Sequence, residues 1–120
     1  MLSRKLVSVD SGTGAVRMTY FAPAEFANRH GTVHGGLQAA MLDSATSKAL
    51  YAQLPPELTA LTMQLTTTFV RPAPLGDLTA TAWVTNRDDR EAHVKAELYD
   101  PAGVVVAHAT ARLRIRKRAM

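Results

Sequence analysis

The stretch HGGLQAAMLDSATSKALYAQ, residues 34–53, decides the fold because it is the one long helical candidate in the chain. It is rich in small and apolar residues, and the two prolines that follow it stop the helix firmly. Two glycines open the stretch, and glycines at a helix start leave the first backbone N–H groups bare. The sequence therefore predicts a helix from Gly35 to about Gln53 with an open N-terminus.

Segments typical of strands lie on both sides of this helix. They cover residues 5–9, 16–21, 61–70, 78–86, 92–100 and 104–115. Turn sequences at 10–14 and 100–103 join the first two and the last two strands, and 23–34 has the composition of a loop with a short helical turn. The expected order is two strands, one long helix and then four strands in a meander.

Strands segregated from a lone helix predict an α+β fold, in which a curved antiparallel sheet of about six strands wraps a long central helix. Small side chains on the helix would let the sheet close tightly around it. They are Ala39, Ala40, Ala45, Ala49 and Ala52. A chain of 120 residues without a visible repeat or linker is expected to form one domain over residues 1–120.

The composition, 47% hydrophobic and 20% charged, is that of a globular protein and not of a disordered chain. The absence of cysteine excludes disulfides, thiolate catalysis and cysteine-based zinc sites. Because His30, His93 and His108 have no carboxylate or second histidine at ligand spacing, we expect no metal site. Neither a secretory signal nor an apolar run of roughly 18 residues is visible, so we expect a cytoplasmic protein without membrane contact.

The net charge of +4 favours anionic partners. Much of it lies near the end of the chain, where Arg112, Arg114, Arg116 and Arg118 would share one face of a strand. Two interpretations stay open: a solvated sheet face, or a surface for the phosphates of a substrate. Nucleic acid is not expected as a partner, because aromatic residues are few and nothing resembles a recognition helix.

Gly35 and Asp43 together suggest acyl chemistry. The bare N–H group of Gly35 can polarise a carbonyl and hold the negative charge that develops on its oxygen. Asp43 follows nearly two helical turns later, on the side of Gly36 and roughly opposite Gln38 and Lys48. Asp43 is therefore not part of the polar stripe, and we expect an acidic group in apolar surroundings beside the carbonyl site.

The chain resembles the hotdog-fold acyl-CoA thioesterases, in particular their PaaI-like, phenylacetate-pathway branch. The motifs that carry the resemblance are the spacing of Asn28, Gly31, His34-Gly35-Gly36 and Asp43, and the later segment FVRPAPLGD at residues 69–77. The resemblance covers the chain from Asn28 to the last strand. It implies an acyl-CoA substrate and a homodimer whose active sites lie at the subunit interface, with two dimers usually paired into a tetramer.

The resemblance also implies a role for each site residue. Gly35 would supply the N–H that polarises the thioester carbonyl, and Asn28 would help bind that carbonyl or the attacking water. Asp43 would act as general base on water or as a nucleophile that forms an anhydride. His34 would orient the thioester, and Thr62 would help position the water across the interface. Coenzyme A is part of the substrate, so no separate cofactor is implied.

A second set of residues would contact the substrate or its coenzyme A phosphates. They are Gly36, Arg71, Pro72, Arg90 and Arg112. A guanidinium group suits phosphate geometry, whereas proline fixes the turn after a strand whatever else it does. The sequence does not rank the three arginines.

Structural alternatives remain for every motif. Asp43 can be an exposed helix aspartate, and His34 can be a loop histidine bonded to the backbone. Asn28 can be a turn cap, and the glycines can serve close packing. Thr62 can be one of several threonines on a strand face. Two rival functions also remain: a hotdog hydratase or dehydratase acting on 3-hydroxyacyl thioesters, and a non-catalytic acyl-CoA-binding module. The function that fits best is an acyl-CoA thioesterase for aromatic or medium-chain acyl groups.

Overall fold

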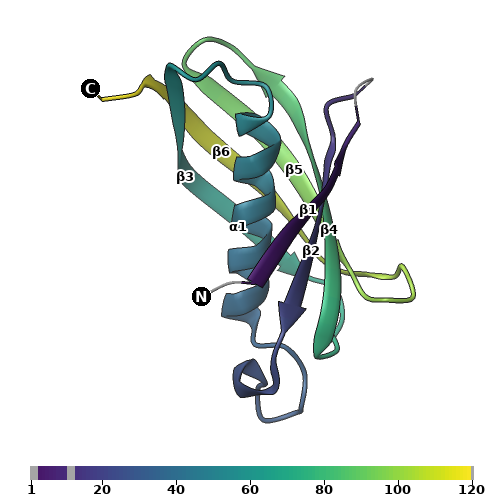
Figure 1. Cartoon of the computed structure of the whole chain (residues 1–120). Helices are drawn as coiled ribbons and strands as arrows, with labels where there is room; N and C mark the ends of the chain where they lie inside the picture. The colour runs from purple at the N-terminus through teal and green to yellow at the C-terminus, as the bar shows by residue number, and fades with distance from the viewer. Residues whose placement is uncertain (1–2, 11–12, 120) are drawn as a thin grey trace.

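The computed structural model has one long helix packed against a single curved antiparallel sheet (Figure 1). It describes residues 3–10 and 13–119, so Ser11 and Gly12 in the expected first turn lie outside the described residues. The elements in chain order are β1 Ser3–Val9, β2 Val16–Ala22, the 3-10 helix η1 Ala24–Phe26, α1 Gly35–Tyr51, β3 Leu58–Phe69, β4 Gly76–Arg87, β5 Glu91–Tyr99 and β6 Val105–Lys117. None of the described helices is long and apolar enough to span a membrane.

Every expected element is present, and the α+β prediction is confirmed. The largest difference in bounds is at β3, which begins at Leu58 and not at 61. The earlier start follows from β6, which continues to Lys117 and pairs with Leu58 there. The hydroxyl of Tyr51, the last residue of α1, also accepts the backbone N–H of Ala60 at 2.9 Å and so fixes this part of β3 beside the helix.

The expected four-strand meander is wrong for β3. The strand order in the sheet is β1-β2-β4-β5-β6-β3, so only the last three strands follow one another in a meander. The free edge of β4 is occupied by β2, which pairs with it from Val16 against Ala82 to Ala22 against Gly76. As a result β3 pairs with β6 instead and becomes an edge strand of the sheet.

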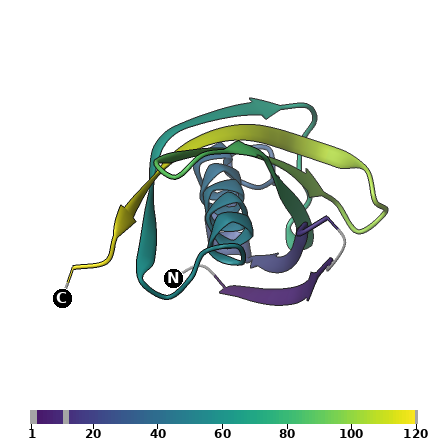
Figure 2. The same cartoon turned by 90° about the horizontal axis from the view of Figure 1, so that it is seen from above.

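Small side chains fill the space between the sheet and the helix, and the expectation of a central helix is confirmed. Seen end-on, α1 lies inside the curve of the sheet (Figure 2). Buried alanines on the sheet are Ala80, Ala82, Ala92, Ala96, Ala107, Ala109 and Ala111. On the helix, Ala45 and Ala49 are fully buried, whereas Ala40 and Ala52 are exposed. Alanine on both surfaces lets the helix approach the sheet closely.

The edge strand β3 contains a bulge. Thr62 pairs with Leu113 and Gln64 pairs with Arg112, so the register shifts at Met63 between them. Because directly opposed residues of a ladder share one face, Thr62 points to the helix side with the buried Leu113, and Gln64 points to the outer side. Apolar side chains on this strand are well exposed, with Leu61 at 50% and Phe69 at 52%.

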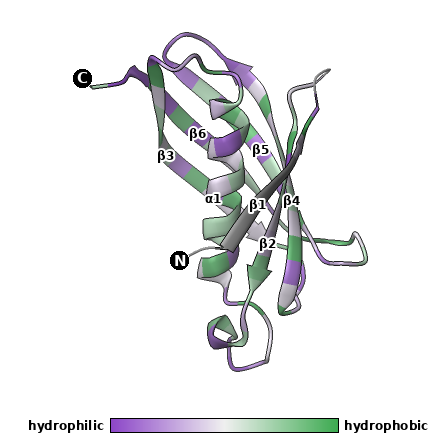
Figure 3. Cartoon of the chain, viewed as in Figure 1, coloured by the Kyte–Doolittle hydropathy of each residue, from purple (hydrophilic) through white to green (hydrophobic). Residues whose placement is uncertain are grey.

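The basic strand β6 alternates as the sequence predicts (Figure 3). Leu113 and Ile115 are buried toward the helix, whereas Arg114 and Arg116 are exposed on the outer face of the sheet. Arg118 lies beyond the strand, and its guanidinium group donates hydrogen bonds to the carbonyl oxygens of Pro56 and Leu58. The expected arginine face is therefore present within β6, but Arg118, which lies beyond the strand, is not part of it.

Candidate active site

The N-terminus of α1 is capped by His34. Its imidazole Nδ1 accepts the backbone N–H of Gly36 at 2.9 Å, and its carbonyl oxygen accepts the N–H groups of Leu37 and Gln38. Among the described residues, nothing accepts the N–H of Gly35. Gly35 therefore offers the bare donor that the sequence predicts, while the N–H of Gly36 is already used.

The cap also fixes the proton on the His34 ring. A nitrogen that accepts an N–H hydrogen bond carries no proton, so the proton of the neutral imidazole lies on Nε2. The side chain is exposed, which leaves this Nε2–H free to donate. His34 is thus built as a hydrogen-bond donor toward solvent and not as a proton acceptor.

Phe69 lies against Gly35, a contact that the sequence did not single out. A Cβ atom added at Gly35 would lie 3.2 Å from Phe69 Cζ and 3.4 Å from Phe69 Cε1. A side chain at position 35 would therefore crowd the ring of this edge-strand residue. Phe69 belongs to the quoted segment at 69–77, but an aromatic residue in a strand looks like a core residue when only the sequence is read.

Asp43 is held by a side chain from β3. The hydroxyl of Thr62 donates a hydrogen bond of 2.8 Å to Asp43 Oδ1, and both residues are half-buried. Among the described residues, the second oxygen, Oδ2, has no hydrogen-bond partner. Asp43 is therefore not an exposed helix aspartate but a carboxylate fixed on one side and open on the other.

Within one chain, Asp43 does not lie beside Gly35 as the sequence analysis expected. The two residues are eight positions apart on the same helix, and a rise of about 1.5 Å per residue puts them about 12 Å apart along its axis. The contacts with β3 show the same separation, because Gly35 contacts Phe69 whereas Asp43 contacts Thr62, seven residues earlier in that strand. The carbonyl site and the carboxylate are therefore separate features of one chain.

Asn28 organises the loop before the helix. Its Oδ1 accepts the N–H groups of His30 and Thr32 and the hydroxyl of Thr32, at 2.9–3.2 Å. The side-chain Nδ2 has no partner among the described residues. The structure therefore shows the turn-capping role for the oxygen of Asn28 and leaves its amide donor available.

Two further contacts place this loop beside the segment that follows β3. The N–H of Val33 donates to the carbonyl oxygen of Ala73 at 2.9 Å, and the amide of the buried Gln38 donates to the carbonyl oxygen of Val33 at 3.1 Å. Arg71 and Pro72 are exposed and immediately precede Ala73. The structure thus brings the Arg-Pro turn close to the start of α1.

The other two expected phosphate-binding arginines lie elsewhere. Arg112 donates to Glu91 Oε1 at 3.1 Å, and the other oxygen of Glu91 lies 3.3 Å from His93 Nε2. Arg112 is therefore engaged in an ion pair. Arg90 opens onto a surface cleft that it shares with Asp88, Glu91, Arg114, Ile115 and Arg116. The structure does not bring these arginines to the start of the helix.

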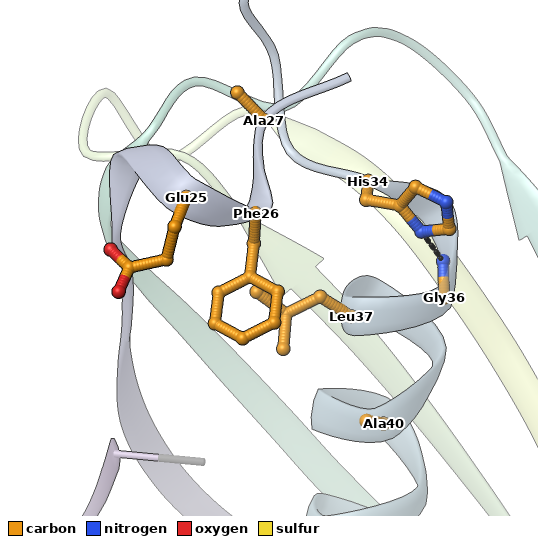
Figure 4. A pocket seen from close by; sticks show the side chains of 7 residues that line it. All are labelled: Glu25, Phe26, Ala27, His34, Gly36, Leu37 and Ala40. Carbon is orange, nitrogen blue, oxygen red and sulfur yellow. Dashed lines mark hydrogen bonds between the residues drawn. The ribbon is translucent and has the colours of Figure 1, made fainter. Parts of the chain in front are cut away.

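A cavity of about 460 Å³ lies next to the start of the helix (Figure 4). It is lined by Glu25, Phe26, Ala27, His34, Gly36, Leu37 and Ala40. The N–H of His34 donates to the carbonyl oxygen of Phe26 at 2.9 Å, so η1 is folded back against the helix start. Sequence reasoning missed this cavity because it is created by that tertiary contact.

Comparisons with known proteins identify the family. The family model for the thioesterase superfamily matches residues 30–107. A comparison with curated proteins gave no match. A solved structure of a phenylacetic acid degradation-related protein from Ralstonia eutropha JMP134 is 33% identical, with a TM-score of 0.89 over 92% of this chain and 83% of that one.

Two more solved structures are similar to the chain. The PaaI protein from the phenylacetic acid degradation operon of E. coli is 26% identical, with a TM-score of 0.84 over 97% of this chain and 80% of that one. The BH2602 protein of Bacillus halodurans, solved with CoA, is 27% identical, with a TM-score of 0.79 over 92% of this chain and 71% of that one. The chain therefore belongs to the thioesterase superfamily, as a thioester hydrolase with the PaaI-like hotdog fold.

Proposed function

We propose that the protein hydrolyses an acyl-CoA with an aromatic or medium-chain acyl group to the free carboxylic acid and coenzyme A. The observation that carries the proposal is the hydrogen bond from Thr62 to Asp43, which fixes a half-buried carboxylate and leaves Oδ2 open. A carboxylate in that state can bind a water molecule and take its proton. The bare N–H of Gly35 supplies the second requirement, a donor for the carbonyl oxygen.

The reaction then needs few groups. Asp43 takes a proton from water, and the water oxygen attacks the thioester carbon while the carbonyl oxygen becomes negatively charged. The Gly35 N–H stabilises that charge, assisted by the Nδ2 of Asn28 and the Nε2–H of His34. The tetrahedral intermediate collapses as the carbon–sulfur bond breaks, and the thiolate takes up the proton. Direct attack by Asp43, through an anhydride that water then cleaves, is the alternative course.

We propose that each active site is built by two chains. A reacting carbon must lie roughly 3–3.5 Å from the attacking group and close to the oxyanion donor. Gly35 and Asp43 of one chain are about 12 Å apart along the helix, so both cannot serve the same carbon. A homodimer in which Gly35 of one protomer faces Asp43 of the other removes this conflict.

The edge strand β3 is the surface that we propose for this dimer. It carries both Thr62 and Phe69, and it exposes Leu61 and Met63 at 50% and 47%. Exposed apolar residues on an unpaired strand edge favour pairing with another chain. Two such dimers would form the tetramer that the family resemblance implies.

For coenzyme A, Arg71 is the best-placed phosphate contact, with Arg90 as the second candidate. Arg71 is exposed and lies in the turn that is bonded to the loop before α1. Arg112 is less available, because Glu91 already pairs with it. The similar protein from B. halodurans was solved with CoA, and this supports a CoA ester as the substrate.

The rival functions are less well supported. A hydratase or dehydratase that uses His34 as base needs a ring nitrogen able to accept a proton, but Nδ1 accepts the Gly36 N–H and Nε2 already carries a proton. A binding module does not need the open oxygen of Asp43.

Thiol release from a panel of aromatic, medium-chain and short-chain acyl-CoAs tests the proposal. We expect the parent protein to turn over, and Asp43→Asn to lose at least about a hundredfold in kcat. Glu57→Gln, a matched change of an exposed acid in the turn between α1 and β3, should leave the rate unchanged. Hydrolysis by Asp43→Asn at the parent rate would refute the mechanism, and a change in unsaturation of enoyl or 3-hydroxyacyl thioesters would favour the hydratase.

A further inference from the structure

The cavity beside the helix start has an apolar body and two polar ends. Phe26, Leu37 and Ala40 supply the apolar walls. In Figure 4, His34 and Gly36 lie on one side of the Phe26 ring and Glu25 lies on the other. The cavity therefore has backbone and imidazole groups at one end and apolar walls in the middle. At its other end lies Glu25, an exposed residue whose carboxylate points away from the Phe26 ring.

The end at Gly36 adjoins the carbonyl site. Gly35, whose N–H is bare, directly precedes Gly36, and the ring of His34 is bonded to that same residue. A thioester held at Gly35 has two arms, an acyl group and the polar, phosphate-bearing coenzyme A. None of the seven lining residues is a lysine or arginine, so the cavity suits the acyl arm and not the phosphates.

Glu25 is the one acidic side chain of the lining. In the described part of the chain no lysine, arginine or histidine forms a salt bridge with it, and the N–H of Phe26 and Ala27 bond backbone carbonyls of η1 and the residue before it. A second carboxylate that reaches the Glu25 end of the cavity would meet this negative charge without a compensating cation. Two like charges about 6 Å apart in a partly wet site weaken binding by roughly threefold to a hundredfold.

We propose that this cavity is the acyl subsite and that Glu25 determines specificity by rejecting acyl groups with a distal carboxylate. The substrate class is then the thioesters of monocarboxylic acids, and the thioesters of dicarboxylic acids are excluded. This inference rests on the proposed thioesterase function. It adds that the acyl group must not carry a negative charge at its far end.

Hexanoyl-CoA and adipoyl-CoA form the matched substrate pair, because their six-carbon acyl groups differ by the terminal carboxylate. The proteins are the parent, Glu25→Gln, Glu25→Lys and the control Glu57→Lys, which makes the same charge change in the turn between α1 and β3. Ratios of kcat/KM come from thiol release. Kd values for both thioesters come from calorimetry in an Asp43→Asn background, so that binding is measured without turnover.

We expect the parent to prefer hexanoyl-CoA in both kcat/KM and Kd. Glu25→Lys should lower the hexanoyl-to-adipoyl ratio by about tenfold or more, and Glu25→Gln by a smaller factor, whereas Glu57→Lys should change it by less than about twofold. The far-ultraviolet circular dichroism and the gel-filtration volume of both Glu25 variants should match those of the parent, which shows that they remain folded.

The outcomes separate the two proposals. If the parent releases no thiol but its Kd ratio depends on Glu25, the acyl subsite is supported and the hydrolase function is refuted. If both thioesters are hydrolysed and the Kd ratio is the same in the parent and in Glu25→Lys, the hydrolase function is supported and the role of Glu25 is overturned. Binding of neither thioester also overturns the subsite.

Discussion

The hydroxyl of Thr62 donates a 2.8 Å hydrogen bond to Asp43 Oδ1, and this bond joins the edge strand β3 to the central helix. It selects which carboxylate oxygen is free, because Oδ1 is occupied and Oδ2 has no hydrogen-bond partner among the described residues. The position of the candidate base is therefore set by a strand that is remote from it in sequence.

Thr62→Val should lower kcat with little change in KM, because it removes the donor that orients Asp43 and keeps the side-chain shape. A hydrogen bond to a charged group contributes about 1.5–3 kcal/mol, so we expect about a tenfold to hundredfold loss in kcat. Thr62→Ser, which keeps the hydroxyl, should retain most of the activity. Thr66→Val is the control on the outer face of the same strand, and an equal loss in that variant would argue against a specific role for Thr62.

Gly35→Ala should slow the reaction because the added Cβ would lie 3.2 Å from Phe69 Cζ and would displace either the ring or the helix start. We expect about a tenfold loss in kcat/KM. The double variant Gly35→Ala/Phe69→Ala should lose less than the two single losses combined, with a coupling of at least about 0.5 kcal/mol. Strictly additive losses in this double-mutant cycle would show that the ring does not limit the site.

Mixing two inactive homodimers tests whether each site is shared between chains. Gly35→Leu removes the carbonyl site of its own chain, and Asp43→Asn removes the base. If Gly35 of one protomer works with Asp43 of the other, a mixed dimer has one intact site, so a statistical mixture should recover roughly a quarter of the parent activity. Sites built within one chain would recover nothing on mixing, since each chain carries one defect.

Asn28→Asp and Asn28→Ala should separate the two roles of this side chain. Asn28→Asp keeps the oxygen that accepts bonds from His30 and Thr32, so its free energy of unfolding should stay near that of the parent. Asn28→Ala should be destabilised by about 1–2 kcal/mol in denaturant unfolding. Both variants should lose about tenfold or more in kcat/KM, because both lose the Nδ2 donor. A fully active Asn28→Asp would confine Asn28 to the loop.

Local signals in the sequence were sufficient to predict α1 and most strand bounds. The glycines at 35 and 36, together with the prolines at 55 and 56, mark the ends of the helix through backbone chemistry that depends on few neighbours. The place of β3 could not be predicted in the same way. Which strand edge it joins depends on β2 already occupying β4, which is a long-range contact between segments far apart in the chain.

The same distinction explains the candidate site. The side chains of His34 and Asn28 bond residues within four positions, so their motif predicts where they lie. Phe69 and Glu25 reach the site only through tertiary contacts, the first across from β3 and the second through the folding back of η1. In sequence, an aromatic in a strand and an acid in a loop carry no signal that separates a site residue from an ordinary one.

The bulge at Met63 divides β3 into two halves that are out of phase with each other. In a regular strand, Thr62 and Leu65 would face opposite sides, yet they pair with Leu113 and Ala111, which are both buried on the helix side. The extra residue is what allows a polar hydroxyl and an apolar anchor three positions apart to serve the same surface. Deleting Met63 would leave Thr62 and Leu65 two positions apart and still on the helix side, so the bulge adds an exposed residue to the sheet edge without changing which residues face the helix.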